Sequence, residues 1–205
     1  MILDYIIIGL YTLSLFVILI YSILQLQLIL NYKKANRKKK IKVDEPEIWP
    51  KVTIQLPLFN EQYVVKRLLD SVSELDYPLD RLEIQVLDDS TDASKNYTEQ
   101  LTRDLMKKGF NAKYIHRIKR KNFKAGALKE GMEIAEGEFV AIFDADFLPQ
   151  KDWLRKTIPH FNSPEIGVVQ TRWGHVNKSY SILTKIQAFA LDFHFVIEQV
   201  GRSHG

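Results

Sequence analysis

Asp144 and Asp146 follow directly after the apolar run of residues 139–143. In an extended chain, alternate side chains point the same way, so both carboxylates would face one side. Like charges this close repel each other unless a cation compensates them. Mg²⁺ and Mn²⁺ favour one or two carboxylates together with oxygens of a substrate phosphate. An Asx turn that caps the next helix is the alternative. The pair is therefore a candidate cation site for a phosphate-bearing ligand.

A second acidic cluster comprises Asp88, Asp89 and Asp92, after the predicted strand at residues 82–87. Asp92 is well placed to cap a helix that begins at Ala93. That role leaves two carboxylates unexplained directly after the predicted strand. A carboxylate at such a position can accept hydrogen bonds from the ring N–H and ribose hydroxyls of a nucleotide. Asp88 and Asp89 are therefore candidate nucleoside ligands.

Lys124 opens a predicted helix and is followed by the small residues Ala125 and Gly126. A helix N-terminus with one lysine is a natural phosphate site. The basic residues just before it, at 117–121, are interpreted as a solvated loop. The chain has neither a Walker loop nor a Gly-x-Gly-x-x-Gly sequence, so ordinary ATP or NAD binding is not supported.

The elements that must position these residues alternate between strand-like and helix-like patterns. The predicted strands are residues 51–56, 82–87, 112–116, 139–143 and 166–170. The predicted helices are residues 61–72, 93–108, 124–135, 152–161 and 180–200. This alternation predicts an α/β fold with a mostly parallel sheet and helices on both faces. Ligands of such sheets bind beyond the carboxyl ends of the strands, so the acidic pairs and Lys124 should share one cleft.

Residues 5–24 contain no charged side chain and are long enough to cross a bilayer as a helix. A cleaved signal peptide would carry positive charge before its apolar run, whereas here Asp4 precedes it and lysines follow. We expect one transmembrane helix at residues 1–30 and a basic juxtamembrane linker at 31–50. Because basic residues stay on the cytoplasmic side, the N-terminus should face outside and the following domain the cytoplasm. The same basic residues could contact lipid headgroups.

The net charge of +4 comes from a short segment, because residues 31–42 hold seven lysines and arginines and no acid. The remainder of the chain is net negative, so we find no basic face for nucleic acid and expect no such partner. The chain has no cysteine. That excludes disulfides, thiolate zinc sites and a cysteine nucleophile.

Taken in order, five short motifs resemble family 2 glycosyltransferases, in particular the cellulose synthase-like A and C branch of mannan, glucomannan and glucan synthases. The motifs are Pro57-Leu58-Phe59-Asn60-Glu61, Asp88-Asp89-Ser90-Thr91-Asp92, Lys124-Ala125-Gly126-Ala127-Leu128, Asp144-Ala145-Asp146 and Gln170-Thr171-Arg172-Trp173. The resemblance implies a GT-A domain (a Rossmann-like nucleotide-diphospho-sugar transferase) over residues 51–205. It also implies inverting transfer from UDP-glucose or GDP-mannose to a growing β-glycan.

The resemblance further implies a role for each candidate residue. Asp88 and Asp89 would hold the nucleoside, and Lys124 would lie near the nucleotide-sugar. Asp144 and Asp146 would hold the diphosphate through Mg²⁺ or Mn²⁺, whose Lewis acidity eases departure of the nucleoside diphosphate. The expected partners are a nucleotide-sugar donor, a glycan acceptor and membrane lipid.

The family's general-base aspartate and its Gln-x-x-Arg-Trp acceptor element are not found in the 205 residues. His194 and Glu198 lie one helical turn apart and could interact, but the family pattern gives their helix a packing role. No catalytic base is assigned. The alternative function is a truncated, non-catalytic fragment that binds nucleotide-sugar. A haloacid dehalogenase-type phosphatase is disfavoured, because that fold places its nucleophile strand first, whereas three predicted strands precede the strand that leads to Asp144.

Overall fold

A computed structural model describes residues 2–36 and 44–195 of the chain. It divides into two compact units, which are described separately below. Val43–Val169 form one unit, and the other comprises Met1–Lys42 with Gln170–Gly205. All the candidate site residues lie in the first of these units.

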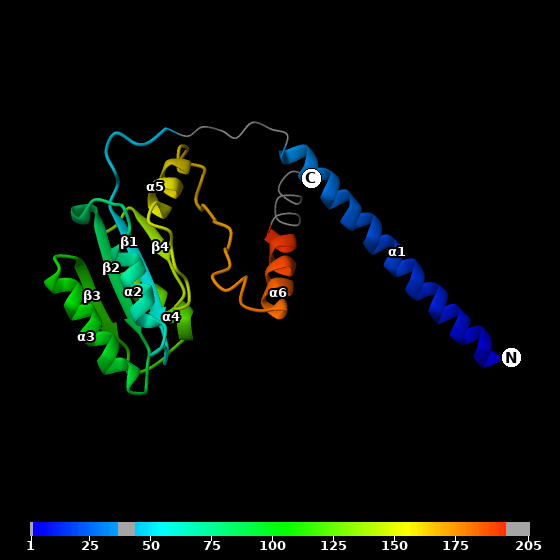
Figure 1. Ribbon diagram of the computed structural model, residues 1–205, viewed down its shortest axis with the longest axis horizontal. Coiled ribbons are helices and arrows are strands. Elements are labelled where there is room, and N and C mark those ends of the chain that lie inside the picture. The colour runs from blue at the N-terminus through cyan, green and yellow to red at the C-terminus, as the bar shows by residue number, and fades with distance from the viewer. Residues whose placement is uncertain (1, 37–43, 196–205) are drawn as a thin grey trace. The chain divides into compact units, whose positions relative to one another are not determined.

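The Val43–Val169 unit is built on a parallel sheet (Figure 1). Within the described residues its strands are β1 (Val52–Leu58), β2 (Leu82–Asp88), β3 (Asn111–His116) and β4 (Phe139–Ile142), in the order β3-β2-β1-β4. Ile54 of β1 lies opposite Ile84 of β2 and Ala141 of β4. This register brings the carboxyl ends of the strands to one edge of the sheet, and the predicted parallel α/β fold is confirmed.

Short helices connect the strands and cover the sheet. They are α2 (Val65–Ser73), η1 (Leu79–Arg81), α3 (Ser94–Lys107), α4 (Phe123–Met132), α5 (Trp153–Thr157) and η2 (Ile158–His160). In place of one continuous helix at residues 152–161, the structure has the short helix α5 followed directly by the 3₁₀ helix η2. Pro159 explains the break, because it lacks the N–H needed to continue an α-helix.

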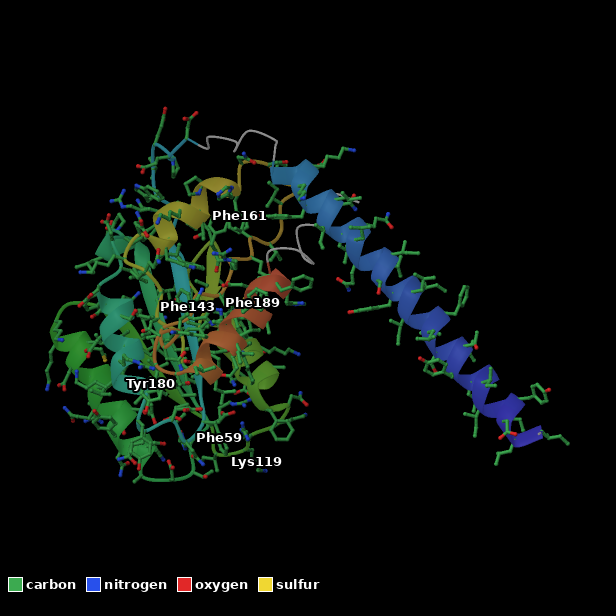
Figure 2. The ribbon with its side chains drawn as sticks, turned by 45° about the vertical axis from the view of Figure 1, so that its right-hand side comes forward. Phe59, Lys119, Phe143, Phe161, Tyr180 and Phe189 are labelled. Atoms are coloured by element: carbon green, nitrogen blue, oxygen red, sulfur yellow. The ribbon has the colours of Figure 1, made fainter. Side chains whose placement is uncertain are left out.

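The main apolar core lies on one face of the sheet. Alternate residues of β1 such as Ile54 and Leu56 are fully buried there, together with Leu68 and Val72 of α2. At the carboxyl edge, the core ends with Phe143, which is labelled in Figure 2. Its ring packs edge-on against Trp153 with centroids 4.8 Å apart. Aromatic packing therefore supports the chain just before Asp144.

The opposite face of the sheet is polar although it is buried. The Thr53 hydroxyl donates to the Glu83 carboxylate at 2.5 Å, and Gln55 donates to Gln85 at 3.0 Å. Lys113 pairs with Glu83 at 2.7 Å. Burial alone would raise the pKa of Glu83, but the hydrogen bonds that it accepts outweigh burial and lower it. These contacts pair Thr53, Glu83 and Gln85 beneath α4, the helix that carries Lys124, whereas the side-chain oxygen of Gln55 is buried without a hydrogen-bond partner.

Residues 166–170, which lie within the described range, form no strand, so that prediction was wrong. Val168 is 82% exposed, and Gly167 interrupts the short apolar run. A parallel strand is stable when it pairs with a neighbour and buries both faces. This segment does neither, because it is not part of the sheet and Val168 is exposed.

In the second unit, α1 (Ile2–Asn36) continues past the predicted end at residue 30. Its segment Ile2–Lys34 is long and apolar enough to cross a membrane, and none of its most apolar stretch is buried in the protein. Lys33 and Lys34 lie in its last turn. The remaining basic residues, 37–42, lie outside the described residues.

The same unit contains α6 (Ile182–Phe193), which begins with a capping box. The Ser181 hydroxyl accepts from the Thr184 N–H at 3.1 Å, and the Thr184 hydroxyl accepts from the Ser181 N–H at 2.9 Å. The predicted helix at 180–200 is thus confirmed for its first part. Residues 196–200, including Glu198, lie outside the described residues.

Candidate active site

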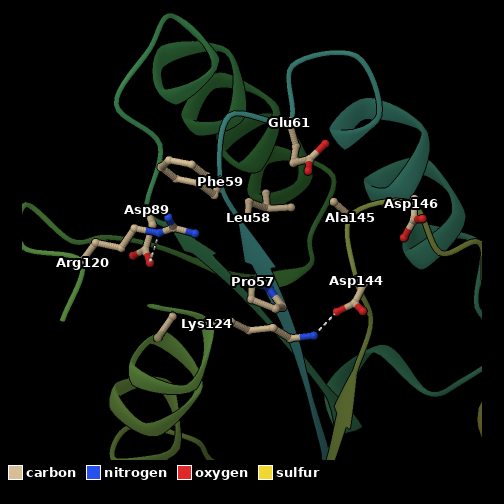
Figure 3. A pocket seen from close by; sticks show the side chains of 11 residues that line it. Pro57, Leu58, Phe59, Glu61, Asp89, Arg120, Lys124, Asp144, Ala145 and Asp146 are labelled. Atoms are coloured by element: carbon tan, nitrogen blue, oxygen red, sulfur yellow. Dashed lines mark hydrogen bonds and ion pairs between the residues drawn. The ribbon is translucent and has the colours of Figure 1, made fainter. Parts of the chain in front are cut away.

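A pocket of about 420 Å³ lies at the carboxyl edge of the sheet (Figure 3). It is lined by the end of β1, by residues that follow β1, β2, β3 and β4, and by the first turns of α4. They are Pro57, Leu58, Phe59, Glu61, Asp89, Arg120, Lys124, Ala127, Asp144, Ala145 and Asp146. Four of the five predicted site residues, Asp89, Lys124, Asp144 and Asp146, therefore meet in one pocket.

Asp144 and Asp146 reach this pocket from a turn and not from an extended strand. β4 ends at Ile142, and the Phe147 N–H donates to the Asp144 carbonyl at 3.0 Å. The Lys124 ammonium donates to the Asp144 carboxylate, as the dashed line in Figure 3 shows. The pair therefore faces the pocket, but the geometry that puts it there is a turn after the strand.

Asp89 is 4% exposed and is held by a bidentate ion pair. Arg117 donates through Nε to Oδ1 at 2.7 Å and through Nη2 to Oδ2 at 2.6 Å. The Asp89 N–H donates to the Leu58 carbonyl at 3.0 Å. A fork-to-fork pair of this kind fixes the plane of the carboxylate as well as its charge.

Asp88 is fully buried and is not among the residues that line the pocket. Its Oδ1 accepts from the Ser90 N–H at 2.9 Å, and its Oδ2 accepts from the Tyr114 hydroxyl at 2.8 Å. Burial, followed by the hydrogen bond to Asp88, raises the pKa of Tyr114. Both carboxylate oxygens thus have protein partners, and the predicted contact of Asp88 with the nucleoside stays a prediction.

Arg117 and Arg120 were interpreted from the sequence as part of a solvated loop, and the structure corrects this. Arg117 is 8% exposed. The Arg120 guanidinium lies 3.5 Å from the centre of the Phe59 ring, in cation–π contact, and lines the pocket. One signal was available in the sequence, because the basic run follows a predicted strand and so belongs to the ligand-binding edge.

The two carboxylates Asp144 and Asp146 fit a divalent cation that also binds a ligand. Across residues 2–36 and 44–195, no group of three or more histidine, cysteine, aspartate or glutamate side chains could hold a metal ion. Two carboxylates leave coordination positions for phosphate oxygens and water, which is how Mg²⁺ is usually held beside a substrate phosphate. The donor set therefore suits Mg²⁺ or Mn²⁺ bound together with a diphosphate.

A parallel α/β domain of this class binds its ligands at the carboxyl edge of the sheet, where this pocket lies. Residues 53–202 match the family described as Glycosyl transferase family 2. The chain belongs to this family and has its GT-A fold. The predicted family and fold are confirmed.

Similar proteins make the relationship more specific. The chain is 48% identical over 160 residues to "Probable glucomannan 4-beta-mannosyltransferase 4" of Oryza sativa subsp. japonica, covering 76% of this chain and 29% of that protein. It is 42% identical over 193 residues to "Glucomannan 4-beta-mannosyltransferase 1" of Cyamopsis tetragonoloba, covering 91% of this chain and 36% of that protein. The chain thus spans about a third of the length of these relatives.

A solved structure is similar as well. It is a mannosyltransferase from Pyrobaculum calidifontis in complex with GDP-Man and Mn²⁺, 32% identical, with a TM-score of 0.58. The match covers 67% of this chain and 41% of that one. That relative therefore combines this fold with a divalent cation and a nucleotide-sugar.

Proposed function

We propose that this chain forms the donor-binding part of a glycosyltransferase that transfers mannose from GDP-mannose, with inversion, to a growing β-glycan. The observation that carries the proposal is the pocket in which Asp89, Lys124, Asp144 and Asp146 come together. The mannosyltransferase relatives, and the GDP-Man in the complex of one of them, support this donor over UDP-glucose.

Each residue has a distinct role in this proposal. Asp144 and Asp146 hold Mg²⁺ or Mn²⁺, which as a Lewis acid stabilises the departing nucleoside diphosphate. The Lys124 ammonium, on the first turn of α4, binds the diphosphate as a point charge. Asp89 faces the nucleoside, because it lines the pocket while Asp88 does not.

Transfer also needs an acceptor hydroxyl that a general base activates. Asp89 and Asp144, two of the carboxylates that line the pocket, are already paired with Arg117 and Lys124. They act in the proposal as ligands and not as bases. Donor binding and glycosyl transfer are therefore separate properties of this chain and are measured separately.

We also propose that α1 anchors the protein in a membrane with the N-terminus outside and the Val43–Val169 unit in the cytoplasm. The apolar length of α1 and the lysines in its last turn support this orientation. In sealed inside-out vesicles, an added protease should digest a tag at the C-terminus and spare one at the N-terminus. Digestion of both tags, or of the N-terminal tag alone, would contradict the orientation.

The donor site is tested by calorimetry on the full chain in detergent. GDP-mannose should bind in the presence of Mn²⁺, and Asp146→Ala should abolish this metal-dependent binding. Asp80→Ala is the matched control, because the Asp80 side chain is 80% exposed and lies in η1, away from the pocket-lining residues. Unchanged binding by Asp146→Ala would overturn the site. Tighter binding of UDP-glucose than of GDP-mannose would overturn the donor.

A further inference from the structure

All five N–H groups of the buried Arg117 guanidinium have acceptors. Besides the two bonds to Asp89, Nη1 donates to the Lys121 carbonyl at 3.2 Å and to the Glu130 carboxylate at 3.1 Å. Nη2 also donates to the Phe123 carbonyl at 2.8 Å. One side chain thus ties together the end of β2, the loop before α4 and α4 itself. A rigid planar fork of five donors is a property of arginine that lysine lacks.

The loop that Arg117 binds has an unfavourable backbone conformation. Asn122 and Phe123 have φ values of 57° and 48°, in the left-handed region. This region is disfavoured for residues other than glycine, above all for bulky ones such as phenylalanine, and it persists where surrounding contacts hold it. The carbonyls that Arg117 captures, those of Lys121 and Phe123, flank this distortion on both sides.

The close packing at Gly126 reinforces the same arrangement. A Cβ atom at Gly126 would lie 2.0 Å from the Lys121 carbonyl oxygen and 2.8 Å from Nη1 of Arg117. The loop therefore lies directly against the first turns of α4, with the guanidinium beside it. Lys124 is the next residue after Phe123, so the direction of its side chain depends on this loop.

We propose that Arg117 is a positioning residue of the donor site, which sets Asp89 and Lys124 at the same time. It orients the Asp89 carboxylate by a bidentate pair, and it holds the distorted loop that leads into the first turn of α4, where Lys124 lies. The nucleoside and diphosphate parts of the pocket are thereby coupled through one guanidinium. Its effect on donor affinity rests on the proposed function, whereas its effect on the loop does not.

The loop is tested first, without any ligand, by hydrogen exchange on the full chain in detergent. Arg117→Lys keeps the charge and removes the fork, and amide exchange in residues 118–124 should become at least tenfold faster. Arg103→Lys is the control, because Arg103 is exposed on α3 and pairs with Glu99 at 2.7 Å. Exchange in this loop as slow as in the parent chain would overturn the proposal, whatever the ligand affinities are.

Binding of GDP with Mn²⁺, measured by calorimetry, tests the coupling. Arg117→Lys should weaken GDP about tenfold or more, which corresponds to about 1.4 kcal/mol. The losses from Arg117→Lys and Lys124→Ala should not add in the double variant, because one effect acts through the other. Additive losses, which general destabilisation would produce, would overturn the coupling. If the parent chain bound neither GDP nor UDP, the proposed function would fail while the exchange result still decided the role of Arg117.

If Arg117→Lys fails to fold, Glu130→Gln tests the same idea more gently. It weakens one acceptor of Nη1 and leaves the pair with Asp89 intact. Glu130 is on the exposed side of α4, so the variant should fold. Faster exchange in residues 118–124 is again the expected result, and an unchanged rate would contradict the proposal.

Discussion

Lys124 and Asp144 form an ion pair between the first turn of α4 and the turn after β4. The ammonium thus neutralises one of the two carboxylates proposed to hold the cation. Both side chains are about half exposed, 51% and 41%, so the pair contributes only about 0.2–1 kcal/mol. In the proposed donor site, we therefore expect a divalent cation to displace the ammonium and leave it available to the diphosphate.

Because of this ion pair, removing the Lys124 ammonium should change the affinity for Mn²⁺ alone and the affinity for the nucleotide in opposite directions. Lys124→Ala should bind Mn²⁺ about twofold to fivefold more tightly in the absence of nucleotide, because no ammonium competes for Asp144. The same variant should bind GDP with Mn²⁺ more weakly, because the diphosphate loses a cationic partner. Electron paramagnetic resonance of free Mn²⁺ and calorimetry measure the two affinities.

Lys129→Ala is the control for this prediction, since Lys129 is an exposed lysine of the same helix. It should leave both affinities unchanged. A Lys124→Ala variant that bound Mn²⁺ more weakly would show that the ammonium does not compete with the cation.

The hydrogen bond between Tyr114 and Asp88 should matter for stability and not for nucleotide binding. Tyr114→Phe removes the hydroxyl that donates to Asp88 and should lower the free energy of unfolding by about 1–3 kcal/mol. Its affinity for GDP with Mn²⁺ should not change, because Asp88 does not line the pocket. Urea unfolding and calorimetry test the two parts. A tenfold loss of nucleotide affinity at full stability would assign Asp88 to the nucleoside instead.

Gly126→Ala should destabilise the protein although alanine is the better helix former. The new methyl group would meet the Lys121 carbonyl at 2.0 Å, so the loop or α4 must move. We expect a loss of about 1–3 kcal/mol, of the size seen for overpacked sites, together with weaker GDP binding. Gly167→Ala is the control, because nothing lies within 4 Å of its added methyl group. Thermal unfolding measures the stability of both variants, and calorimetry measures their GDP binding. A Gly126→Ala variant more stable than the parent would contradict the close packing.

The ion pairs of Glu136 with Lys113 and Lys51 should make the free energy of unfolding depend on pH in the acid range. Lys113, followed by Lys51, lowers the pKa of Glu136 to about 2 by hydrogen bonding and charge. A carboxyl group whose pKa is lower in the folded state stabilises the fold above its unfolded pKa, about 4.5. That stabilisation is lost as the pH falls from about 4.5 towards 2.

Urea unfolding of the parent chain and of Glu136→Gln measures this contribution. The parent should be the more stable at pH 7, and the difference should shrink between pH 4.5 and 2. Glu133→Gln, at an exposed glutamate just after α4, is the control and should show a smaller difference. A difference between parent and Glu136→Gln that grew on acidification would contradict the assignment.

The main elements of the fold could be predicted from the sequence because buried parallel strands are nearly continuous apolar runs. Residues 139–143 are such a run and correspond to β4, whereas residues 82–87, which form β2, alternate apolar residues with Glu83 and Gln85. The run at 166–170 has a similar composition but forms no strand. Its composition could not show that it would stay exposed without a pairing partner.

The sequence by itself determined which groups stand at the carboxyl edge. The carboxyl ends of parallel strands meet there, so acids that follow different strands come together, as Asp89 and Asp144 do. The tertiary structure alone decided which of two neighbouring aspartates faces the pocket and that Arg117 is buried beside it. Neighbouring residues of a strand point to opposite sides, and the side that borders the pocket depends on where α4 packs.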